Sequence, residues 1–375
     1  MKIRKVEATR VDVPIAVTVL GLDKKTSMSV CLVEIETDEG HTGWGLTSIT
    51  SPTVVAAAVN SECAPVLIGE DPMDTEKLWD KLYWTLSPRG QTGFGLHAIA
   101  AIDLALWDIK GKALGEPVWR LLGGARSRVP LYATFGFPIF DRDQIGEAAK
   151  LWVENGFTRL KMTVGDGALK RRDEPRFIPD VIAEDLERVR RVRTAVGDEI
   201  GLYVDGNCNL DPFHAKEIAK GMEEFDISFF EEPITQNDAL QMADLRRHTS
   251  IPLACGQNEG LAFRFRDLLI AGSVDVVQPN VAITGGFTQC VKIAGMAQAF
   301  NVGIDNGGAW QFHNMHLHAG LANGGMVEMH YLAHELYKTL YTGLPEPDNG
   351  WLDLPAEPGL GFEPKRDVIR ELGVK

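Results

Sequence analysis

Three polar residues recur at equal intervals in the middle of the chain, and this spacing constrains the fold more than any other feature. Asp205 ends the run GLYVD, Glu231 ends FFE, and Gln257 follows IPLACG, with 26 positions between successive members (205 to 231 and 231 to 257). Short apolar runs that alternate with amphipathic helical patterns indicate strand–helix units and a parallel sheet. We therefore expect these residues at the carboxyl ends of three successive strands.

The alternation of strand and helix patterns extends over most of the chain. Between residues 126 and 344 it gives close to eight strand–helix units, the usual size of a (β/α)8 barrel, whose active site lies at the carboxyl ends of the strands. Residues 1–125 begin with strands and continue with a run of helices, which indicates a separate α+β domain. We expect residues 345–375 to return to that domain and complete it as a cap on the barrel.

The charge and the cysteines argue against several classes of protein. The net charge is −14, and the only basic run, RVRRVR, has the apolar spacing of an ordinary helix, so nucleic-acid binding is not expected. The apolar runs fall short of the ~18 residues that a membrane span needs, and no signal leader opens the sequence. Five scattered cysteines are typical of reduced thiols in a cytoplasmic protein.

The three evenly spaced residues have the chemistry of a metal site. Asp205, Glu231 and Gln257 each offer an oxygen, and convergent oxygen ligands favour a hard divalent cation, with Mg2+ as the expected one. The alternative is that they are solvated side chains that cap the following helices. A single aspartate would fit that alternative, but three side chains at equivalent strand ends favour the metal.

Longer motifs resemble a known family. They are HTGWG, AIDLALWDIKGKALGEPVWRLLGG, GFTRLKMTVG, VDGN, FFEEP, GQNE, QPN with TGG, and PGLG. Together they resemble the enolase superfamily, in its mandelate racemase and muconate-lactonizing branch, over essentially the whole chain. The resemblance implies a modified barrel beneath an α+β capping domain, and metal-assisted removal of a proton next to a carboxylate. It places the metal ligands at Asp205, Glu231 and the residue after Gly256.

The third metal ligand departs from the family pattern. The family has Glu where this chain has Gln257, whose amide oxygen can still bind Mg2+ but carries no charge. One unit-charge contact at ~4 Å and an effective dielectric of ~20 is about 4 kcal/mol, an upper bound on the weakening. Glu259 could supply the missing charge directly or through a water, so Gln257 and Glu259 are both candidates.

The acid–base residues that the resemblance implies are also largely replaced. The family often has two lysines on the second barrel strand, whereas this chain has Lys161 and Thr163, and threonine cannot remove a proton unaided. Lys161 is therefore either a base, with its pKa lowered by burial and a nearby cation, or a cation that binds the substrate carboxylate. The histidine and aspartate of strands seven and six are absent, since Gly307 and Asn280 stand there.

Other residues near these strand ends are candidates for the missing roles. Asp305 and His313 could transfer the proton, and Glu328 matches a strand-eight acid that contacts the substrate carboxylate or donates a proton in racemase-like members. The candidates for substrate binding are Thr163, Asn207, Asn280, Asn306 and Arg89.

Three functions are consistent with this pattern. The first is a Mg2+-dependent lyase of the acid-sugar dehydratase type, because the polar replacements suit a hydroxyl-rich ligand. The second is a racemase or epimerase of a related carboxylate, which needs two opposed bases. The third is a catalytically impaired or repurposed barrel that binds a small carboxylate. The resemblance also implies a homo-oligomer.

Overall fold

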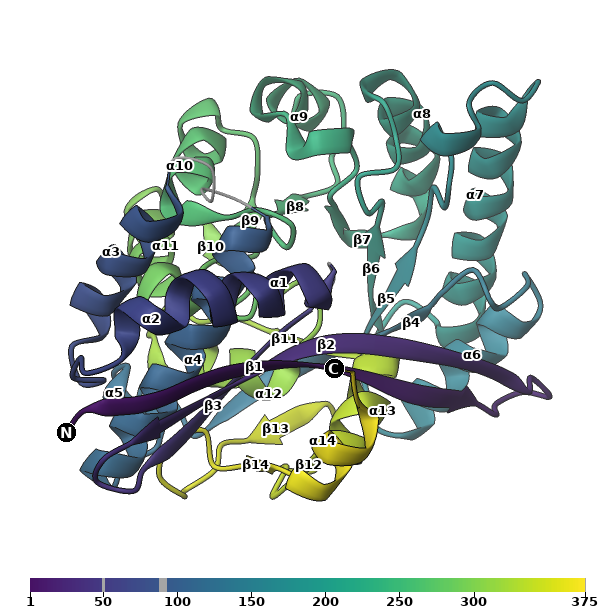
Figure 1. Cartoon of the computed structure of the whole chain (residues 1–375). Coiled ribbons are helices and arrows are strands. Elements are labelled where there is room, and N and C mark those ends of the chain that lie inside the picture. Colours follow the sequence, from purple (N-terminus) through teal and green to yellow (C-terminus); the bar gives the residue numbers. More distant parts are fainter. Residues whose placement is uncertain (49–50, 88–92, 375) are drawn as a thin grey trace.

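The computed structural model describes residues 1–48, 51–87 and 93–374 and shows a barrel covered by an N-terminal cap (Figure 1). Its parallel strands are hydrogen-bonded in the order β10-β9-β8-β7-β6-β5-β4-β11. Their bounds are β4 (Arg128–Gly136), β5 (Arg159–Thr163), β6 (Gly201–Asp205), β7 (Ile227–Glu231), β8 (Leu253–Cys255), β9 (Val276–Val277), β10 (Gly303–Ile304) and β11 (Val327–His330). The predicted modified (β/α)8 barrel with a capping domain is thereby confirmed.

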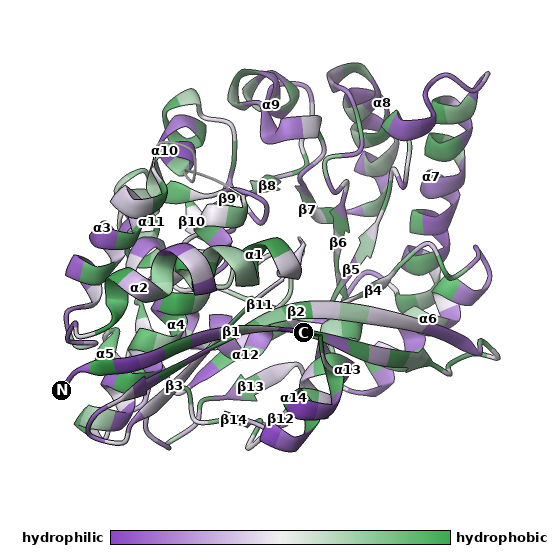
Figure 2. Cartoon of the chain, in the orientation of Figure 1, coloured by the Kyte–Doolittle hydropathy of each residue, from purple (hydrophilic) through white to green (hydrophobic). Residues whose placement is uncertain are grey.

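A helix follows each barrel strand and packs on the outside of the sheet. These helices are α6 (Gln144–Glu154), α7 (Phe177–Val196), α8 (Pro212–Met222), α9 (Ala239–Arg246), α10 (Leu261–Ala271), α11 (Gly286–Ala299), α12 (Gln311–Gly320) and α13 (Tyr331–Leu340). Helix α7 shows the expected amphipathic pattern, since it buries Ile178, Ile182, Val189 and Val192. Its buried face also holds Asp185, Arg188 and Arg193, and Asp185 and Arg188 pair with each other. Figure 2 shows the resulting alternation of polar and apolar bands along α7 and α8.

The barrel closes between β10 and β11 through few main-chain bonds. In the described part of the chain, one backbone hydrogen bond joins the residues just after β10 to the residue just before β11, from Asn306 N–H to Met326 O at 2.9 Å. Two side chains supplement it, since Asp305 Oδ1 accepts from Met326 N–H at 2.6 Å and Asn306 Oδ1 accepts from Glu328 N–H at 3.1 Å. Side chains therefore replace part of the backbone ladder at this seam.

The cap combines an antiparallel sheet with helices. The sheet consists of β1 (Ile3–Val17), β2 (Lys24–Thr37), β3 (Thr42–Ser48) and the terminal β15 (Gly373–Val374), in the order β15-β1-β2-β3. The helices are α1 (Pro52–Ala58), α2 (Ala64–Leu67), α3 (Thr75–Leu86), α4 (Phe94–Leu114) and α5 (Val118–Leu121). Glycines in the HTGWG motif let α4 approach β3 closely, because a Cβ at Gly45 would lie 1.8 Å from Ala101 O.

The C-terminal segment contacts both parts of the molecule. Strand β15 pairs with β1, which brings the end of the chain back to the cap, whereas β13 (Trp351–Asp353) pairs with β4 of the barrel. The other elements of this segment are β12 (Tyr341–Thr342), β14 (Glu363–Pro364) and α14 (Arg366–Leu372). The domain boundaries predicted at residues 125 and 345 stay predictions. No helix in the described residues is both long and apolar enough to span a membrane.

Buried hydrogen bonds fix the cap on the barrel. Asp103 of α4 accepts from the hydroxyl of Thr288 in α11 at 2.6 Å and from its backbone N–H at 3.0 Å. Trp79 of α3 donates to Gly285 O at 2.7 Å, just before α11 begins. Asp108 of α4 also accepts from the backbone N–H groups of Trp44 and Leu360. The acidic residues of the AIDLALWDIK motif thus connect α4 to the barrel, the cap sheet and the C-terminal segment.

Candidate active site

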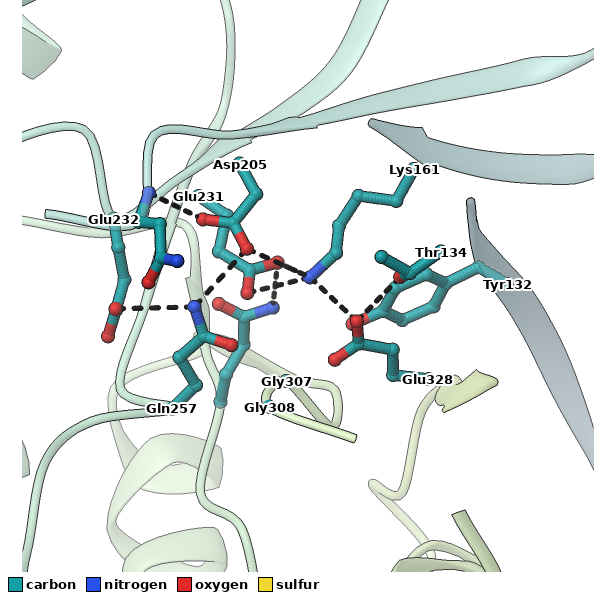
Figure 3. Close-up of polar contacts among 12 residues, drawn as sticks. Tyr132, Thr134, Lys161, Asp205, Glu231, Glu232, Gln257, Gly307, Gly308 and Glu328 are labelled. Carbon is teal, nitrogen blue, oxygen red and sulfur yellow. Dashed lines mark hydrogen bonds and ion pairs between the residues drawn. The ribbon is translucent and has the colours of Figure 1, made fainter. Parts of the chain in front are cut away.

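Strand register brings the evenly spaced residues to one level of the barrel. Thr163 pairs with Asp205, and Asp205 pairs with Glu231. Gln257 follows the next strand after one glycine, and its Nε2 lies 3.3 Å from Asp205 Oδ2. The predicted convergence of Asp205, Glu231 and Gln257 at three successive strand ends is therefore what the structure shows (Figure 3).

Lys161 lies at the centre of this group and carries its positive charge. Its Nζ is 2.8 Å from both carboxylate oxygens of Glu231, 3.4 Å from Asp205 Oδ2 and 3.2 Å from Glu328 Oε1. Burial by itself would lower the pKa of Lys161, but the charges of Glu231, Glu328 and Asp205 outweigh burial and raise it. The side chain is thus an ammonium group surrounded by three carboxylates.

Glu328 is held in place by three neighbours. Thr134 donates its hydroxyl to Oε1 at 2.5 Å, Ala309 donates its backbone N–H to Oε2 at 2.9 Å, and Lys161 forms the ion pair. Burial opposes ionisation of this carboxyl, but Lys161 and the hydrogen bonds outweigh it and lower the pKa of Glu328. Glu328 is therefore an anionic anchor between β4, β5 and the loop after β10.

Asp205, Gln257, Glu328 and Thr134 line one end of a cavity of about 340 Å³, and Lys161 and Glu231 lie buried behind them. Its wall is mostly polar at the barrel end and includes Thr134, Thr163, Asp166, Asp205, Asn207, Asn209, Gln257, Asn258, Glu328 and His330. Phe137, Trp310 and Leu332 add apolar surface, and Met28 of β2 is the contribution of the described cap residues. A larger groove of about 610 Å³ between β1 and α14 contains none of the carboxylates around Lys161.

The donor set fits a hard divalent cation, provided that the amide of Gln257 takes part. Among the described residues, no three His, Cys, Asp or Glu side chains are arranged to hold a metal ion. Two carboxylates and one amide do converge, and Gln257 now directs Nε2 toward Asp205 and Glu232. Half a turn of that amide exchanges Nε2 for Oε1 and completes a set of three oxygen ligands.

Glu259 does not reach this site. Its Oε2 accepts from Arg264 Nε at 2.8 Å and its Oε1 accepts from Asn237 Nδ2 at 3.1 Å, so both oxygens are engaged outside the cavity. Of the two candidates for the third ligand, Gln257 lies beside Asp205 and Glu259 is engaged elsewhere, and the choice between them as a metal ligand stays a prediction. Glu232 is also unsuited to be a ligand, because it accepts from Asn258, Asn237 and the backbone of Gly256.

Two candidates for the base lie away from the cavity. Asp305 turns toward the start of β11, where Oδ1 accepts from Met326 N–H, and burial raises the pKa of Asp305 to about 7. His313 is fully buried in α12 with its Nδ1 2.5 Å from the hydroxyl of Tyr337. Burial lowers the pKa of His313 to about 3. The structure therefore supports neither residue as the base, since Asp305 holds the seam between β10 and β11, and His313 packs against Tyr337, Tyr341 and Phe362 outside the sheet.

Two predicted substrate ligands instead support the loop after β10. Asn280 Nδ2 donates to the carbonyl oxygens of Gly307, Gly308 and Ala309 at 2.7, 3.0 and 3.2 Å. Asn306 donates to Gly307 O and accepts from the backbone N–H of Glu328. Both asparagines are fully buried and shape the wall without lining the cavity.

The remaining predicted substrate ligands have different outcomes. Thr163 and Asn207 line the cavity; the hydroxyl of Thr163 donates to Gly136 O at 3.0 Å, and the backbone N–H of Asn207 donates to Asp205. Arg89 lies outside the described residues.

Close packing around Gly307 leaves no room for a histidine at this position of the loop after β10. A Cβ there would lie 3.0 Å from Glu231 Oε1 and 3.1 Å from Gln278 Nε2. A larger side chain would displace the carboxylate that Lys161 contacts. The positions at which the resemblance implies an acid–base pair are thus taken by Gly307 and Asn280, which belong to a closely packed loop and its support.

His330 is a cavity residue that the sequence analysis did not identify. It lies two positions after Glu328 on β11, and residues two apart on a strand face the same side. That spacing was a usable signal once Glu328 had been recognised. Gln278, which donates to Glu231 Oε2 at 2.9 Å, and Asn314, which donates to Asn280 Oδ1 at 3.0 Å, were also missed.

The fold and the site define an enzyme-like capped barrel, and sequence comparison identifies the family. A family model for the mandelate racemase / muconate lactonizing enzyme N-terminal domain matches residues 2–123, and an enolase C-terminal domain-like model matches residues 144–368. The chain belongs to the mandelate racemase and muconate lactonizing branch of the enolase superfamily.

Several relatives match along nearly the whole chain. Arabinonate dehydratase of Saccharolobus solfataricus is 31% identical over 93% of this chain and 91% of its own length. D-galactarolactone cycloisomerase of Agrobacterium fabrum is 32% identical over 96% of this chain and 95% of its own. A crystal structure of a racemase from Streptomyces coelicolor with bound magnesium has a TM-score of 0.88 and 27% identity, covering 99% of this chain and 100% of that one.

Proposed function

We propose that this chain is a Mg2+-dependent acid-sugar dehydratase. It would break the C–H bond next to the substrate carboxylate and the C–O bond of the neighbouring hydroxyl, releasing water, and the resulting enol would become a 2-keto acid. The observation that carries the proposal is the convergence of Lys161 with Asp205, Glu231 and Gln257, directly behind the polar end of the cavity that Asp205, Gln257 and Glu328 line. The relatives named for sugar acids support the same substrate class.

Each residue of the site has a role in this proposal. Asp205, Glu231 and Gln257 would hold Mg2+, which when bound supplies positive charge to the substrate carboxylate as the α-proton leaves. Lys161 is the proposed proton-transfer residue, because its Nζ lies beside those ligands. The surrounding carboxylates keep Lys161 protonated. When a bound cation compensates their negative charge, burial lowers the pKa of Lys161 and favours the neutral amine. Glu328 fixes the position of Lys161 on the other side.

The loop after β10 favours an elimination over a racemisation. A racemase needs acid–base groups on both faces of the reacting carbon. That loop contributes Gly308, Ala309 and Trp310 to the cavity, and none of these can transfer a proton. A single acid–base residue suffices for a dehydratase, because the proton that it takes from the α-carbon can be returned to the departing hydroxyl group, which leaves as water.

The experiment is to incubate the protein with Mg2+ and a panel of sugar acids in D2O. A dehydratase gives a 2-keto acid, detected as its semicarbazone, with deuterium at C3. A racemase instead gives deuterium at C2 with no loss of water. Absence of both products and of exchange across the panel would contradict the enzymatic proposal and leave the carboxylate-binding barrel.

A pair of variants separates the two roles of Lys161. Lys161→Ala should lower turnover by about 100- to 10,000-fold, the range for loss of a general acid–base residue. Lys161→Arg keeps the charge but cannot act as a base near neutral pH. If the arginine variant retained turnover, Lys161 would be a carboxylate-binding cation. Homo-oligomeric assembly and a cytoplasmic location stay predictions from the sequence.

A further inference from the structure

His330 forms part of the wall that a substrate would meet. It ends β11 and lines the cavity with Thr163 and Glu328. In the register of β11 with β4, His330 pairs with Thr134 two positions after Glu328 pairs with Tyr132. Both side chains therefore face the inside of the barrel, with His330 one step nearer its mouth.

The ring of His330 is held on two sides. Its Nδ1 accepts a hydrogen bond from the backbone N–H of Ala333 in the first turn of α13, at 3.4 Å. Its ring packs against Phe137 with a centroid separation of 4.8 Å. A ring nitrogen that accepts a hydrogen bond carries no proton, so the neutral ring has its proton on Nε2.

The surroundings of His330 favour the neutral ring. Burial lowers the pKa of His330 below its ordinary value; the carboxylates of Glu328 and Asp205 act in the opposite direction, and the Lys161 ammonium adds to the lowering. The N-terminus of α13 also disfavours a positive charge on the ring. A neutral ring that is protonated on Nε2 donates a hydrogen bond and cannot accept a proton at that nitrogen.

We propose that His330 is a further catalytic residue, which donates its Nε2–H as a neutral imidazole to a hydroxyl or carboxylate oxygen of the substrate. This inference rests on the dehydratase function proposed above and adds an uncharged donor to it. The donor is aimed from the mouth side of the cavity, whereas Lys161 and the metal ligands act from the floor. A donor to an oxygen that gains negative charge is worth about 100- to 1,000-fold in rate.

The protonation state can be measured on the free protein. Nine histidines are present, and 15N-histidine labelling with comparison of wild type and His330→Asn assigns the His330 signals. We expect 15N shifts of a neutral ring with its proton on Nε2 from pH 6 to 8. Arabinonate with Mg2+ should then shift the Nε2–H signal. A proton on Nδ1, a charged ring at pH 7, or no response to saturating arabinonate would overturn the proposal.

His330→Asn is the matched variant for activity. Asparagine is among the best residues for accepting from the first turn of a helix, so the variant keeps the cap on α13 while losing the donor in the cavity. We expect an unchanged melting temperature and a kcat at least about 100-fold lower, on whichever sugar acid the wild type converts. His248→Asn, an exposed histidine on the loop after α9, is the control and should change neither quantity.

The outcomes separate this inference from the proposed function. Wild-type kcat in His330→Asn, with a sugar acid that wild type dehydrates, contradicts the role of His330 and leaves the dehydratase function standing. Failure of the wild type to convert any sugar acid contradicts the dehydratase function. In that case the NMR response of Nε2–H to the bound sugar acid still decides whether His330 is a ligand-binding donor.

Discussion

The ammonium nitrogen of Lys161 lies 2.8 Å from both carboxylate oxygens of Glu231, and neither side chain has exposed surface. A buried ion pair of this kind costs much free energy to form, and removing one partner leaves the other charge uncompensated. The pair therefore couples the chemistry of the site to the stability of the barrel.

Lys161→Met should lower the free energy of unfolding by about 3–5 kcal/mol at pH 8, because it leaves Glu231 and Glu328 buried without their cation. The loss should be smaller at pH 5, since burial and the neighbouring carboxylates favour protonation of Glu231 once Lys161 is absent. Urea unfolding at the two pH values measures both quantities. Lys150→Met, on the exposed face of α6, is the control; equal losses at pH 8 and pH 5 would contradict the argument.

Gln257→Glu should strengthen Mg2+ binding by at least about tenfold, because it restores a third negative ligand where the amide now stands. Calorimetry on the wild type and the variant measures the change. Glu259→Gln provides the contrast: Glu259 is engaged by Arg264 and Asn237, so its loss should leave the Mg2+ affinity within about threefold of wild type. A larger loss in Glu259→Gln than in Gln257→Ala would show that Glu259 is the ligand.

Asn280→Asp should destabilise the protein by about 2–3 kcal/mol at pH 7, because a carboxylate oxygen would face the three carbonyl oxygens that Nδ2 now binds. Part of the loss should be recovered in acid, where a protonated carboxyl group can donate one hydrogen bond. Thermal unfolding at pH 7 and pH 4.5, each compared with wild type at the same pH, measures the difference. Asn301→Asp is the exposed control.

The histidines of α12 should make the protein sensitive to acid. Burial lowers the pKa of His313, His316 and His318 to about 3, whereas the unfolded chain has the ordinary value near 6.5. Between these values the unfolded state binds more protons, so stability falls as pH drops below about 6.5. Each histidine contributes up to about 1.4 kcal/mol per pH unit.

A single substitution isolates one of these protons. His316→Gln keeps a side-chain amide that can donate to Leu360 O, as the ring nitrogen does at 3.1 Å. Between pH 6 and pH 4, unfolding of the variant should take up about one proton fewer than unfolding of the wild type. Its unfolding free energy should therefore change less steeply with pH. A wild-type slope in His316→Gln would show that this histidine does not titrate on unfolding.

The sequence predicted correctly which residues lie at the same height in the barrel, but it predicted less well which side chains point into the cavity. Equal spacing of Asp205, Glu231 and Gln257 translated directly into strand register, because each interval contains one strand and one return helix. Asp305 was misplaced because β10 is only two residues long, and beyond its end the alternation of inward and outward positions no longer applies. The hydrogen bond from Met326 N–H determines where the Asp305 side chain points, and no local sequence pattern indicates a partner so distant in the chain.

Partners distant in sequence also decided the other departures. Glu259 is drawn out of the site by Arg264 and Asn237, and Asn280 is engaged by the loop it supports. His330 was predictable from its spacing after Glu328, but its hydrogen bond to Ala333 depends on where α13 begins. Sequence patterns thus located the catalytic end of the barrel, and tertiary packing determined which side chains face it.

The seam between β10 and β11 gives the barrel mouth mechanical compliance. Strand β11 pairs with β4 at four positions, whereas one main-chain bond and the side chains of Asp305 and Asn306 join the ends of β10 and β11 here. A barrel with few hydrogen bonds between two of its strands can widen there while the hydrogen bonds between its other strands stay intact. The seam lies between the loop that carries Ala309 and the strand that carries Glu328, so we expect any widening of the barrel mouth to occur along this wall of the cavity.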